Sequence, residues 1–297
     1  MQRRGFMTEI KGTTRVCGLI GNPVGHSVSP AIHNNLARLT ERNLVYTTFK
    51  VEKGDVATAV KGAYSLNILG LNVTVPHKSE VIDSLVDIDP LAKAIGAVNT
   101  LVRVEGGYKG YNTDILGLAR ELEDEGIELE SSEVIILGAG GAARAITFLC
   151  ASRKAKRVYI LNRTVDKAQN IANAVNEYFH NECVIPMNIN DYESIPGGGY
   201  IVIQTTSVGL YPNNDEAVIE DEAFYRKVAV GVDIIYNPAQ TRFMSLVKAQ
   251  GKKAYNGLKM LLYQGISAYE LWNECTVSRQ DAEEVYNILL KETGTDE

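Results

Sequence analysis

A glycine-rich turn near the middle of the chain has the composition of a phosphate-binding loop. The turn, Gly138 to Ala143, follows an apolar run at 134–137 that is typical of a buried parallel strand, and it precedes an alanine-rich helix predicted for 142–150. Glycine permits a sharp turn and a close approach of phosphate, and the helix N-terminus favours a pyrophosphate. Such a turn is weak evidence alone, but a second strand, 157–161, follows about 20 residues on. The segment therefore predicts a dinucleotide-binding unit.

The second strand of that unit ends where a dinucleotide fold reads the ribose. The chain has Asn162, Arg163 and Thr164 at this point, with Lys167 one helical turn later. An acidic residue would bind the 2′-hydroxyl of NAD, whereas a cation suits the 2′-phosphate of NADP. Arg163 and Lys167 therefore predict NADP as the cofactor. Asp166 is the one acid close by, and it keeps NAD as the alternative.

Two serines at a spacing of two, Ser27 and Ser29, stand at the start of a predicted helix in the first third of the chain. Ser29 followed by Pro30 is a good helix start, with serine as the N-cap and proline at the first helical position. Capping alone would explain Ser29, but it does not explain Ser27. The two hydroxyls could also bind a carboxylate, and residue chemistry leaves both interpretations open.

A lysine and an aspartate also stand at points where predicted elements change. The run 68–75 reads as a strand that ends at Pro76, which we expect to open the next helix. Lys78 then lies at the carboxyl edge of the sheet, where open α/β sheets bind ligands. A lone lysine is usually a solvated surface residue, so its position is what singles it out. Asp114 opens the predicted helix 115–125, either as an N-cap or as a functional carboxylate.

The alternation of strands and helices predicts a parallel sheet in each half of the chain. Residues 101–110 read as a hairpin turned at Gly106 and Gly107. Gln264 falls on a mostly apolar helix predicted for 256–272, where a polar side chain needs a partner. The other predicted strands are 15–20, 44–51, 200–204 and 228–234, and the other predicted helices are 55–65 and 279–291.

Bulk composition excludes several classes of protein. The 297 residues are enough for two domains. The net charge of −6 gives no indication of a basic face that would bind nucleic acid. No apolar run approaches the ~18 residues that span a bilayer. The four cysteines and four histidines show no metal-ligand spacing, and the scattered cysteines suit a reducing cytosol better than disulfides. We expect a soluble cytoplasmic protein without a bound metal, a nucleic-acid partner or a membrane partner.

Several strings of residues, in a specific order and spacing, resemble the shikimate/quinate dehydrogenase family, and in particular its NADP-dependent shikimate dehydrogenases. The similarity runs from Gly21 to Trp272, nearly the whole chain. The strings begin at Gly21 (GNPVGHSVSP), Asn72 (NVTVPHK), Gly96 (GAVNT), Tyr111 (YNTD), Gly138 (GAGGA), Asn162 (NRT), Thr205 (TTSVG) and Met260 (MLLYQ).

The resemblance implies a two-domain α/β fold. An N-terminal βα substrate-binding domain, 1–113, would be completed by the C-terminal helices within 257–297. A Rossmann-like NADP-binding domain, 114–256, would lie between them in sequence, with the active site in the cleft. The implied reaction is the reversible NADPH-dependent reduction of 3-dehydroshikimate to shikimate in chorismate and aromatic amino-acid biosynthesis. The implied partner is that small-molecule substrate, and the implied assembly is a monomer or homodimer.

The resemblance also assigns roles to individual residues. Lys78 and Asp114 would be the catalytic pair. The substrate would be bound by Ser27 and Ser29 at its carboxylate and by Thr74, Asn99, Tyr236 and Gln264 elsewhere. The cofactor would be held by Gly138, Ala139, Gly140, Gly141, Ala142, Asn162, Arg163, Thr164 and Lys167, with Ile234 and Gly257 near the nicotinamide. Many members have a second arginine where this chain has Lys167, and the loss of that bidentate fork predicts a softer preference for NADP.

The implied chemistry fits the residues present. Reduction of a ring ketone needs a hydride and a proton donor at the developing alkoxide, and a lysine oriented by a carboxylate supplies the proton. Two alternatives remain at this stage. One is a quinate/shikimate dehydrogenase that uses NAD, and the other is a non-enzymatic, cofactor-binding regulator, which the presence of both Lys78 and Asp114 disfavours.

Overall fold

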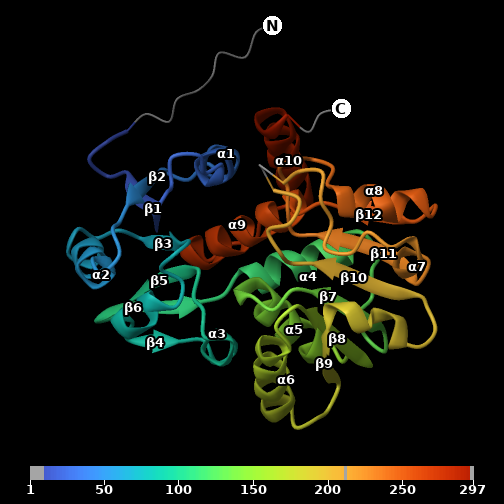
Figure 1. Cartoon of the computed structure of the whole chain (residues 1–297). Coiled ribbons are helices and arrows are strands. Elements are labelled where there is room, and N and C mark those ends of the chain that lie inside the picture. The colour runs from blue at the N-terminus through green and yellow to red at the C-terminus, as the bar shows by residue number, and fades with distance from the viewer. Residues whose placement is uncertain (1–9, 211–212, 295–297) are drawn as a thin grey trace, which may run out of the picture. The chain divides into compact units, whose positions relative to one another are not determined.

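The computed structural model describes residues 10–210 and 213–294 (Figure 1). Their contacts divide the chain into two compact units, each with its own six-stranded sheet. The first unit contains the described residues up to Gly117 together with Leu262–Glu292, and the second is formed mainly by Leu118–Leu261. In these described ranges no helix is both long enough and apolar enough to cross a membrane.

The first unit contains a mixed sheet with the strand order β2-β1-β3-β5-β6-β4. Its strands are β1 (Arg15–Gly21), β2 (Leu44–Lys50), β3 (Gly70–Val73), β4 (Asp87–Ile88), β5 (Thr100–Val104) and β6 (Gly107–Tyr111). β1 runs parallel to β2 and β3, as predicted, but β5 is antiparallel to both of its neighbours. The predicted parallel sheet is therefore confirmed for β1, β2 and β3, whereas β5 departs from it. The predicted hairpin is confirmed, and its tight turn at Gly106, with a φ of +80°, makes β6 antiparallel to β5.

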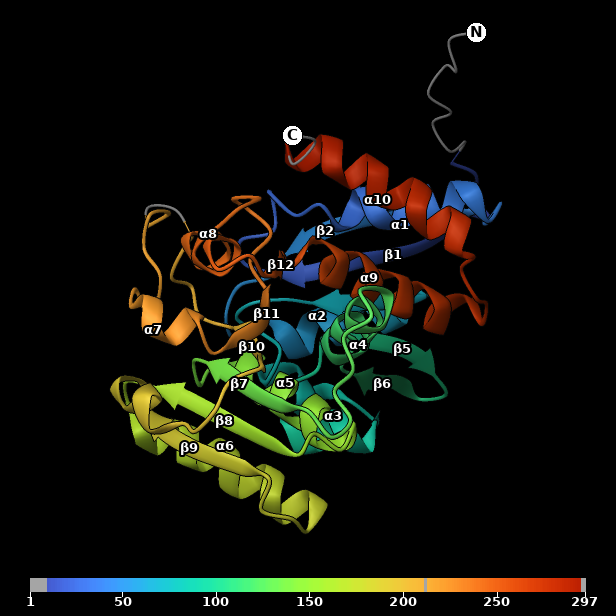
Figure 2. The same ribbon diagram turned by 90° about the vertical axis from the view of Figure 1, so that its right-hand side faces the viewer.

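Helices of the first unit pack onto this sheet in Figures 1 and 2. α1 contacts β2, and α2 packs against a short 3₁₀ helix, η1. Val75–Pro76 is followed by a turn and then by η1, so the prediction that Pro76 opens an α-helix was wrong. Its helices are α1 (Ser29–Leu39), α2 (Val56–Ser65), η1 (Glu80–Ser84) and α3 (Pro90–Ile95).

The C-terminal helices α9 (Leu258–Asn273) and α10 (Arg279–Thr293) bring distant sequence onto the first unit. The indole of Trp272 donates to the carbonyl of Leu101 at 2.9 Å, and it fills the space beside Gly70 where a Cβ would clash. The hydroxyl of Tyr269 bonds that of Thr40 at 2.6 Å. The C-terminal helices are therefore part of the core of this unit.

The second unit has an all-parallel sheet with the order β12-β11-β10-β7-β8-β9. Read from β9, and with the strands numbered within the unit, the order is 3-2-1-4-5-6, that of the Rossmann fold. The strands are β7 (Glu133–Leu137), β8 (Arg157–Asn162), β9 (Val184–Asn188), β10 (Tyr200–Gln204), β11 (Val228–Asp233) and β12 (Lys253–Tyr255). The sequence analysis did not find the two edge strands, because β9 contains Pro186 and β12 has three residues.

Helices α5 and α6 pack together against β7, β8 and β9, and α8 packs on β11 and β12 (Figure 1). The bounds are α5 (Gly141–Ser152), α6 (Val165–Phe179), η2 (Ile189–Ser194), α7 (Glu222–Tyr225) and α8 (Arg242–Ala249). α4 (Asp114–Asp124) begins in the first unit and ends in the second. The central strands are almost wholly buried, as their unbroken apolar sequence predicts.

Candidate active site

Lys78 and Asp114, 36 residues apart in sequence, form an ion pair in the first unit. The ammonium nitrogen of Lys78 donates to Oδ2 of Asp114 at 2.6 Å. The two side chains are 33% and 24% exposed, so the pair is neither solvated freely nor sealed from water. Such a pair can exchange a proton with a bound molecule and then with solvent.

Asn99 fixes the second oxygen of the Asp114 carboxylate. Its Nδ2 donates to Oδ1 of Asp114 at 2.9 Å. Its own Oδ1 accepts from the backbone N–H of Thr113 at 2.7 Å and from the hydroxyl of Thr100 at 3.1 Å. Because these donors occupy the amide oxygen, the amide nitrogen has to face the carboxylate. The carboxylate is thus held from both sides and cannot rotate without breaking a buried network.

The alternative in which Asp114 caps α4 was wrong. The side chain that bonds the start of this helix belongs to Asn112, whose Oδ1 accepts from the N–H groups of Asp114 at 3.1 Å and Ile115 at 3.4 Å. Asp114 is the first residue of the helix, and its carboxylate bonds Lys78 and Asn99 instead. Asn112 therefore caps the helix, and the Asp114 carboxylate is available to interact with other groups.

His77 anchors the segment that carries Lys78. Its imidazole is fully buried, with Nε2 donating to the carbonyl of Val51 at 2.8 Å and Nδ1 lying 3.2 Å from a carboxylate oxygen of Glu80. The backbone carbonyl of Lys78 also accepts from the N–H of Val98 at 2.8 Å. Contacts on both sides thus fix the backbone from which the lysine side chain extends.

The two serines lie together at the start of α1. The hydroxyl of Ser27 donates to that of Ser29 at 3.1 Å, and the N–H of Ser29 donates back to Ser27 at 3.2 Å. Ser29 is the first helical residue and not the N-cap, and Val28 holds the cap position without a side-chain bond. The prediction of a serine cap was therefore wrong, because the Ser29 hydroxyl is bound to the Ser27 side chain.

Thr74 follows the carboxyl end of β3, and its methyl group packs where a Cβ at Gly21 would be. Glycine is required at position 21 for this close approach. Gln264 lies half-buried on the part of α9 that belongs to the first unit. The structure thus places Ser27 and Thr74 beyond the carboxyl ends of the neighbouring strands β1 and β3.

A buried polar chain behind these residues was not found by sequence reasoning. The hydroxyl of Tyr46 donates to Asn72 at 2.8 Å, and Asn72 donates to the hydroxyl of Thr100 at 3.1 Å. Thr100 in turn contacts Asn99, which holds Asp114. Burial raises the pKa of Tyr46 well above its usual range, so this hydroxyl remains a donor. The only sequence signal was a polar residue, Asn72, inside an apolar strand.

The glycine loop of the second unit is open where a phosphate would approach. Gly138 has a φ of +108°, and a Cβ there would lie 2.8 Å from Thr206 and 2.9 Å from Thr205, beyond the neighbouring strand β10. A Cβ at Gly140 or Gly141 would meet nothing within 4 Å. α5 starts here with no side-chain cap and no acidic residue in its first turn. The residues present therefore fit a dinucleotide pyrophosphate.

The predicted ribose site lies at the start of α6. Arg163, Thr164 and Lys167 are exposed, and in the described part of the chain neither cation has an ion pair. Thr164 is the N-cap residue of α6, yet its hydroxyl makes no capping bond. Asn162 donates to the carbonyl of Thr164 at 2.8 Å and orders the turn. Two cations and a hydroxyl at a helix start suit a phosphate group.

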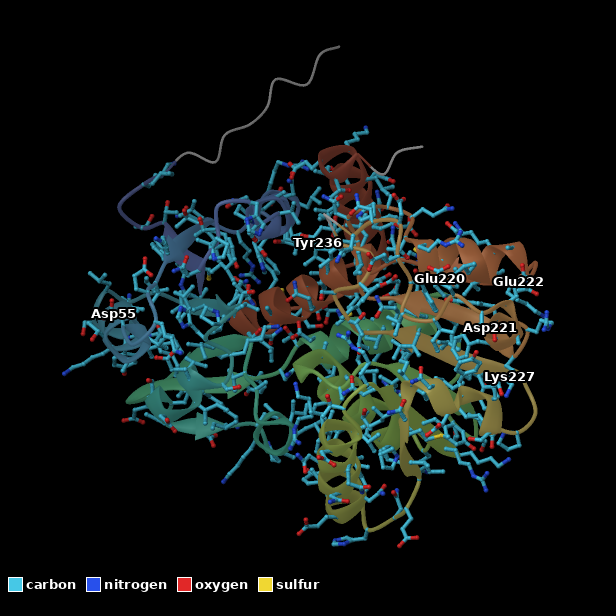
Figure 3. The ribbon with its side chains drawn as sticks, viewed as in Figure 1. Asp55, Glu220, Asp221, Glu222, Lys227 and Tyr236 are labelled. Atoms are coloured by element: carbon cyan, nitrogen blue, oxygen red, sulfur yellow. The ribbon has the colours of Figure 1, made fainter. Side chains whose placement is uncertain are left out.

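A third group of predicted residues gathers beyond β11. Gly257 packs against the backbone of Ile234, where a Cβ would clash, and Tyr236 lies half-buried in the loop after the strand (Figure 3). Asp233, which sequence reasoning missed, orders this loop. Its fully buried carboxylate accepts from the N–H of Ile235 at 3.0 Å and the hydroxyl of Thr241 at 2.7 Å. Burial raises its pKa to about 6.

Two family models match the chain, one in each unit. Residues 19–101 match the substrate-binding domain of shikimate dehydrogenase, and residues 118–234 match shikimate/quinate 5-dehydrogenase. Together they cover more than half of the sequence. The chain belongs to the shikimate dehydrogenase family. The family predicted from the sequence and the combination of a substrate-binding domain with a Rossmann-like domain are thereby confirmed.

Individual members of the family align over nearly their full length. An NADP⁺ shikimate dehydrogenase of Bacillus anthracis is 38% identical over 94% of this chain and 99% of its own. A solved shikimate dehydrogenase in complex with NADP⁺ is 35% identical, with a TM-score of 0.87 over 96% and 98% of the two chains. The Listeria monocytogenes enzyme, solved with shikimate and NAD, is 30% identical, with a TM-score of 0.87 over 96% and 100%.

Proposed function

We propose that this chain catalyses the reversible reduction of 3-dehydroshikimate to shikimate with NADPH, a step in chorismate and aromatic amino-acid biosynthesis. The observation that carries the proposal is the ion pair of Lys78 with Asp114, held by Asn99 in the unit that matches the family's substrate-binding domain. A Rossmann-ordered second unit, which matches the dehydrogenase model, supports the nucleotide half of the reaction. We also propose a cytoplasmic location, because the four cysteines are free and thiols stay reduced in the cytosol.

In the proposed mechanism Lys78 handles the proton. NADPH, when bound, supplies the hydride that reaches the carbonyl carbon. The Lys78 ammonium gives its proton to the carbonyl oxygen as negative charge develops there, and the oxygen becomes the product hydroxyl. Asp114 orients the ammonium throughout, because Asn99 prevents the carboxylate from turning. The partial exposure of Lys78 lets solvent restore its proton, and in the oxidation direction the neutral amine accepts the proton back.

The remaining residues are proposed to position the substrate and the cofactor. The Ser27 and Ser29 hydroxyls, joined in one pair, would donate to the substrate carboxylate. Thr74, Asn99, Gln264 and Tyr236 would contact its other groups. The open backbone from Gly138 to Ala142 would bind the pyrophosphate, and Ile234 and Gly257 would lie by the nicotinamide. Asn162, Arg163, Thr164 and Lys167 would bind the adenosine phosphate. The same division of roles gives residues 1–113 and 257–297 to substrate binding and 114–256 to NADP.

The proposal is tested by steady-state assay of the purified full-length chain with shikimate and quinate against NADP⁺ and NAD⁺. We expect the highest kcat/KM for the pair of shikimate and NADP⁺. A higher kcat/KM with NAD⁺ would favour the NAD-using alternative. The absence of turnover with all four pairs, in protein that still binds NADPH, would favour the non-enzymatic regulator.

Arg163→Ala is expected to weaken NADP(H) binding about tenfold to a hundredfold and to change NAD(H) binding little. Only NADP(H) carries the 2′-phosphate, and a charge-assisted contact with it is worth roughly 1.5–3 kcal/mol. Both affinities are measured by titrating the protein with each reduced cofactor and following the fluorescence of the tryptophan or of the cofactor. Arg226→Ala, which removes an exposed arginine elsewhere in the second unit, is the control. Equal losses for both cofactors would contradict the assignment.

Ser27→Ala is expected to raise the KM for shikimate about tenfold, because one charge-assisted hydrogen bond to the carboxylate is lost. The affinity for NADPH should stay unchanged. Ser29→Ala should behave in the same way and keep its melting temperature, since Ser29 does not cap α1. Steady-state kinetics and thermal unfolding measure both effects. A wild-type KM in Ser27→Ala would place the carboxylate elsewhere, and a clear loss of stability in Ser29→Ala would reinstate the cap.

A further inference from the structure

The first unit contains a polar cavity of about 290 Å³ that the proposed reaction does not use. Its lining includes three arginines, Arg15, Arg42 and Arg103, and one carboxylate, Glu274. The three cations and one anion give a net charge of +2, in a chain whose total charge is −6. A concentration of positive charge at one cavity therefore runs against the charge of the whole protein.

The cavity lies at the opposite edge of the sheet from the candidate substrate residues. Arg15 is the first residue of β1, and Leu69, also in the lining, directly precedes the parallel strand β3. Ser27 and Thr74 follow the other ends of these same two strands. A seven-residue strand is roughly 20 Å long, so the cavity is a separate place and not an extension of the substrate site.

Among the described residues, no carboxylate forms an ion pair with the arginines of the cavity. Arg103 is held in place, since it donates to the carbonyl of Tyr64 at 2.8 Å and its guanidinium carbon lies 3.9 Å from the centre of that ring. Arg15 and Arg42 are exposed. The lining thus has an excess of positive charge, which a bound anion would offset.

One wall of the cavity is rigid. Trp272 is buried, its indole donates to the carbonyl of Leu101, and it fills the place of a side chain at Gly70. The cavity is therefore not a gap between mobile side chains only. A defined wall with arginine residues in the same lining is the kind of surface on which a phosphate can bind with a fixed orientation.

We propose that this cavity binds a small phosphate monoester. A phosphate monoester carries between about −1.5 and −2 charges at neutral pH, which matches the net charge of the lining. In this proposal the flat guanidinium groups of the exposed Arg15 and Arg42 bind its oxygens in pairs, as arginine does with phosphate, whereas Arg103, whose guanidinium is held by Tyr64, adds its charge. Glu274 accepts a hydrogen bond from a hydroxyl group on the remainder of the ligand.

Calorimetric titration of glycerol 3-phosphate into the full-length protein, at low ionic strength in a buffer without phosphate, tests the proposal. We expect saturable binding that Arg42→Ala weakens at least about tenfold, with a smaller loss in Arg42→Lys, which keeps the charge but not the fork. Arg15→Ala should weaken binding as well. Arg226→Ala, in the second unit, should bind as the wild type does. Because Arg15 and Arg42 are exposed, these variants should keep the wild-type melting temperature without ligand.

The candidate NADP site is the competing place for a phosphate, and Arg163→Ala separates the two. Binding that survives Arg163→Ala and is lost in Arg42→Ala supports the cavity. Binding that is lost in Arg163→Ala and survives in Arg42→Ala overturns it, as does the absence of saturable binding in the wild type. Replacing glycerol 3-phosphate by glycerol at the same concentration should abolish the heat, and an equal signal with glycerol would likewise overturn the proposal.

Discussion

Lys78→Ala is expected to lower kcat at least about a hundredfold while leaving the KM for shikimate nearly unchanged. The lysine donates its proton to charge that develops only in the transition state, so its loss falls on the chemical step. General acid catalysis contributes between about 10² and 10⁴ in rate. Steady-state kinetics in both directions measure the change. Lys61→Ala, which removes a lysine from the exposed surface of α2, is the control and should keep the wild-type kcat. A near-normal kcat in Lys78→Ala would remove the proposed mechanism.

Asp114→Asn tests whether the two residues act as one unit. The amide keeps the shape of the carboxylate but has no negative charge. It therefore cannot form the charge-assisted hydrogen bond with the Lys78 ammonium, and both kcat and substrate affinity should fall. The double variant should be little worse than the more damaged single variant, because each change removes the same arrangement. Losses that multiply independently would show separate roles for Lys78 and Asp114.

Glu121→Gln is expected to stabilise the protein at alkaline pH, by up to about 5 kcal/mol above pH 8. Glu121 of α4 is 1% exposed, and burial raises its pKa to about 8, with further repulsion from Glu125, in the turn after the helix, and from Asp124, its last residue. Lys259 of α9 opposes the rise, but it bonds both Asp124 and Glu125. In the wild type, between the unfolded pKa of 4.5 and the folded pKa of about 8, the Glu121 carboxyl is therefore neutral in the folded protein and ionised in the unfolded chain.

The sign of this effect follows from proton linkage. Below the unfolded pKa of about 4.5 Glu121 is protonated in both states, and its contribution to stability is fully present. As the pH rises towards 8, ionisation of the unfolded chain removes that contribution, whereas glutamine is indifferent to pH. Urea unfolding of both proteins at pH 5 and pH 8.5 should show a gap that widens with pH. A gap that is equal at both pH values would mean that Glu121 ionises normally in the folded state.

The second unit shows what a local pattern can determine. An apolar run, a glycine turn and an alanine-rich helix follow one another between residues 133 and 152, and each is dictated by neighbours in sequence. Arg163 was predicted to bind a phosphate from its position directly after the next strand, and this prediction needed no knowledge of a distant residue. For these reasons the dinucleotide-binding segment was predictable from local sequence, whereas the strand order and the edge strands β9 and β12 were not.

The roles of the polar side chains at the substrate site were decided by contacts between distant segments. Local rules assign Ser29 and Asp114 to helix caps, and they are correct about where the helices begin to within one residue. They fail for the side chains, because Ser29 bonds the Ser27 hydroxyl. The Asp114 carboxylate likewise bonds Lys78 and Asn99 and does not cap the helix. Which partner a hydroxyl or carboxylate selects depends on what the fold brings within about 3 Å of it.

The sequence by itself thus determined the family and the two kinds of unit, but it predicted a helix at Lys78 where the structure has a turn. Only the tertiary structure decided that Lys78 meets Asp114, that Asn112 takes over the cap, and that Asp233 orders the loop after β11. It also decided that three arginines from separate segments line one cavity. The physical reason is that backbone periodicity is local, whereas burial, pKa and charge arise from groups that the chain brings together across many residues.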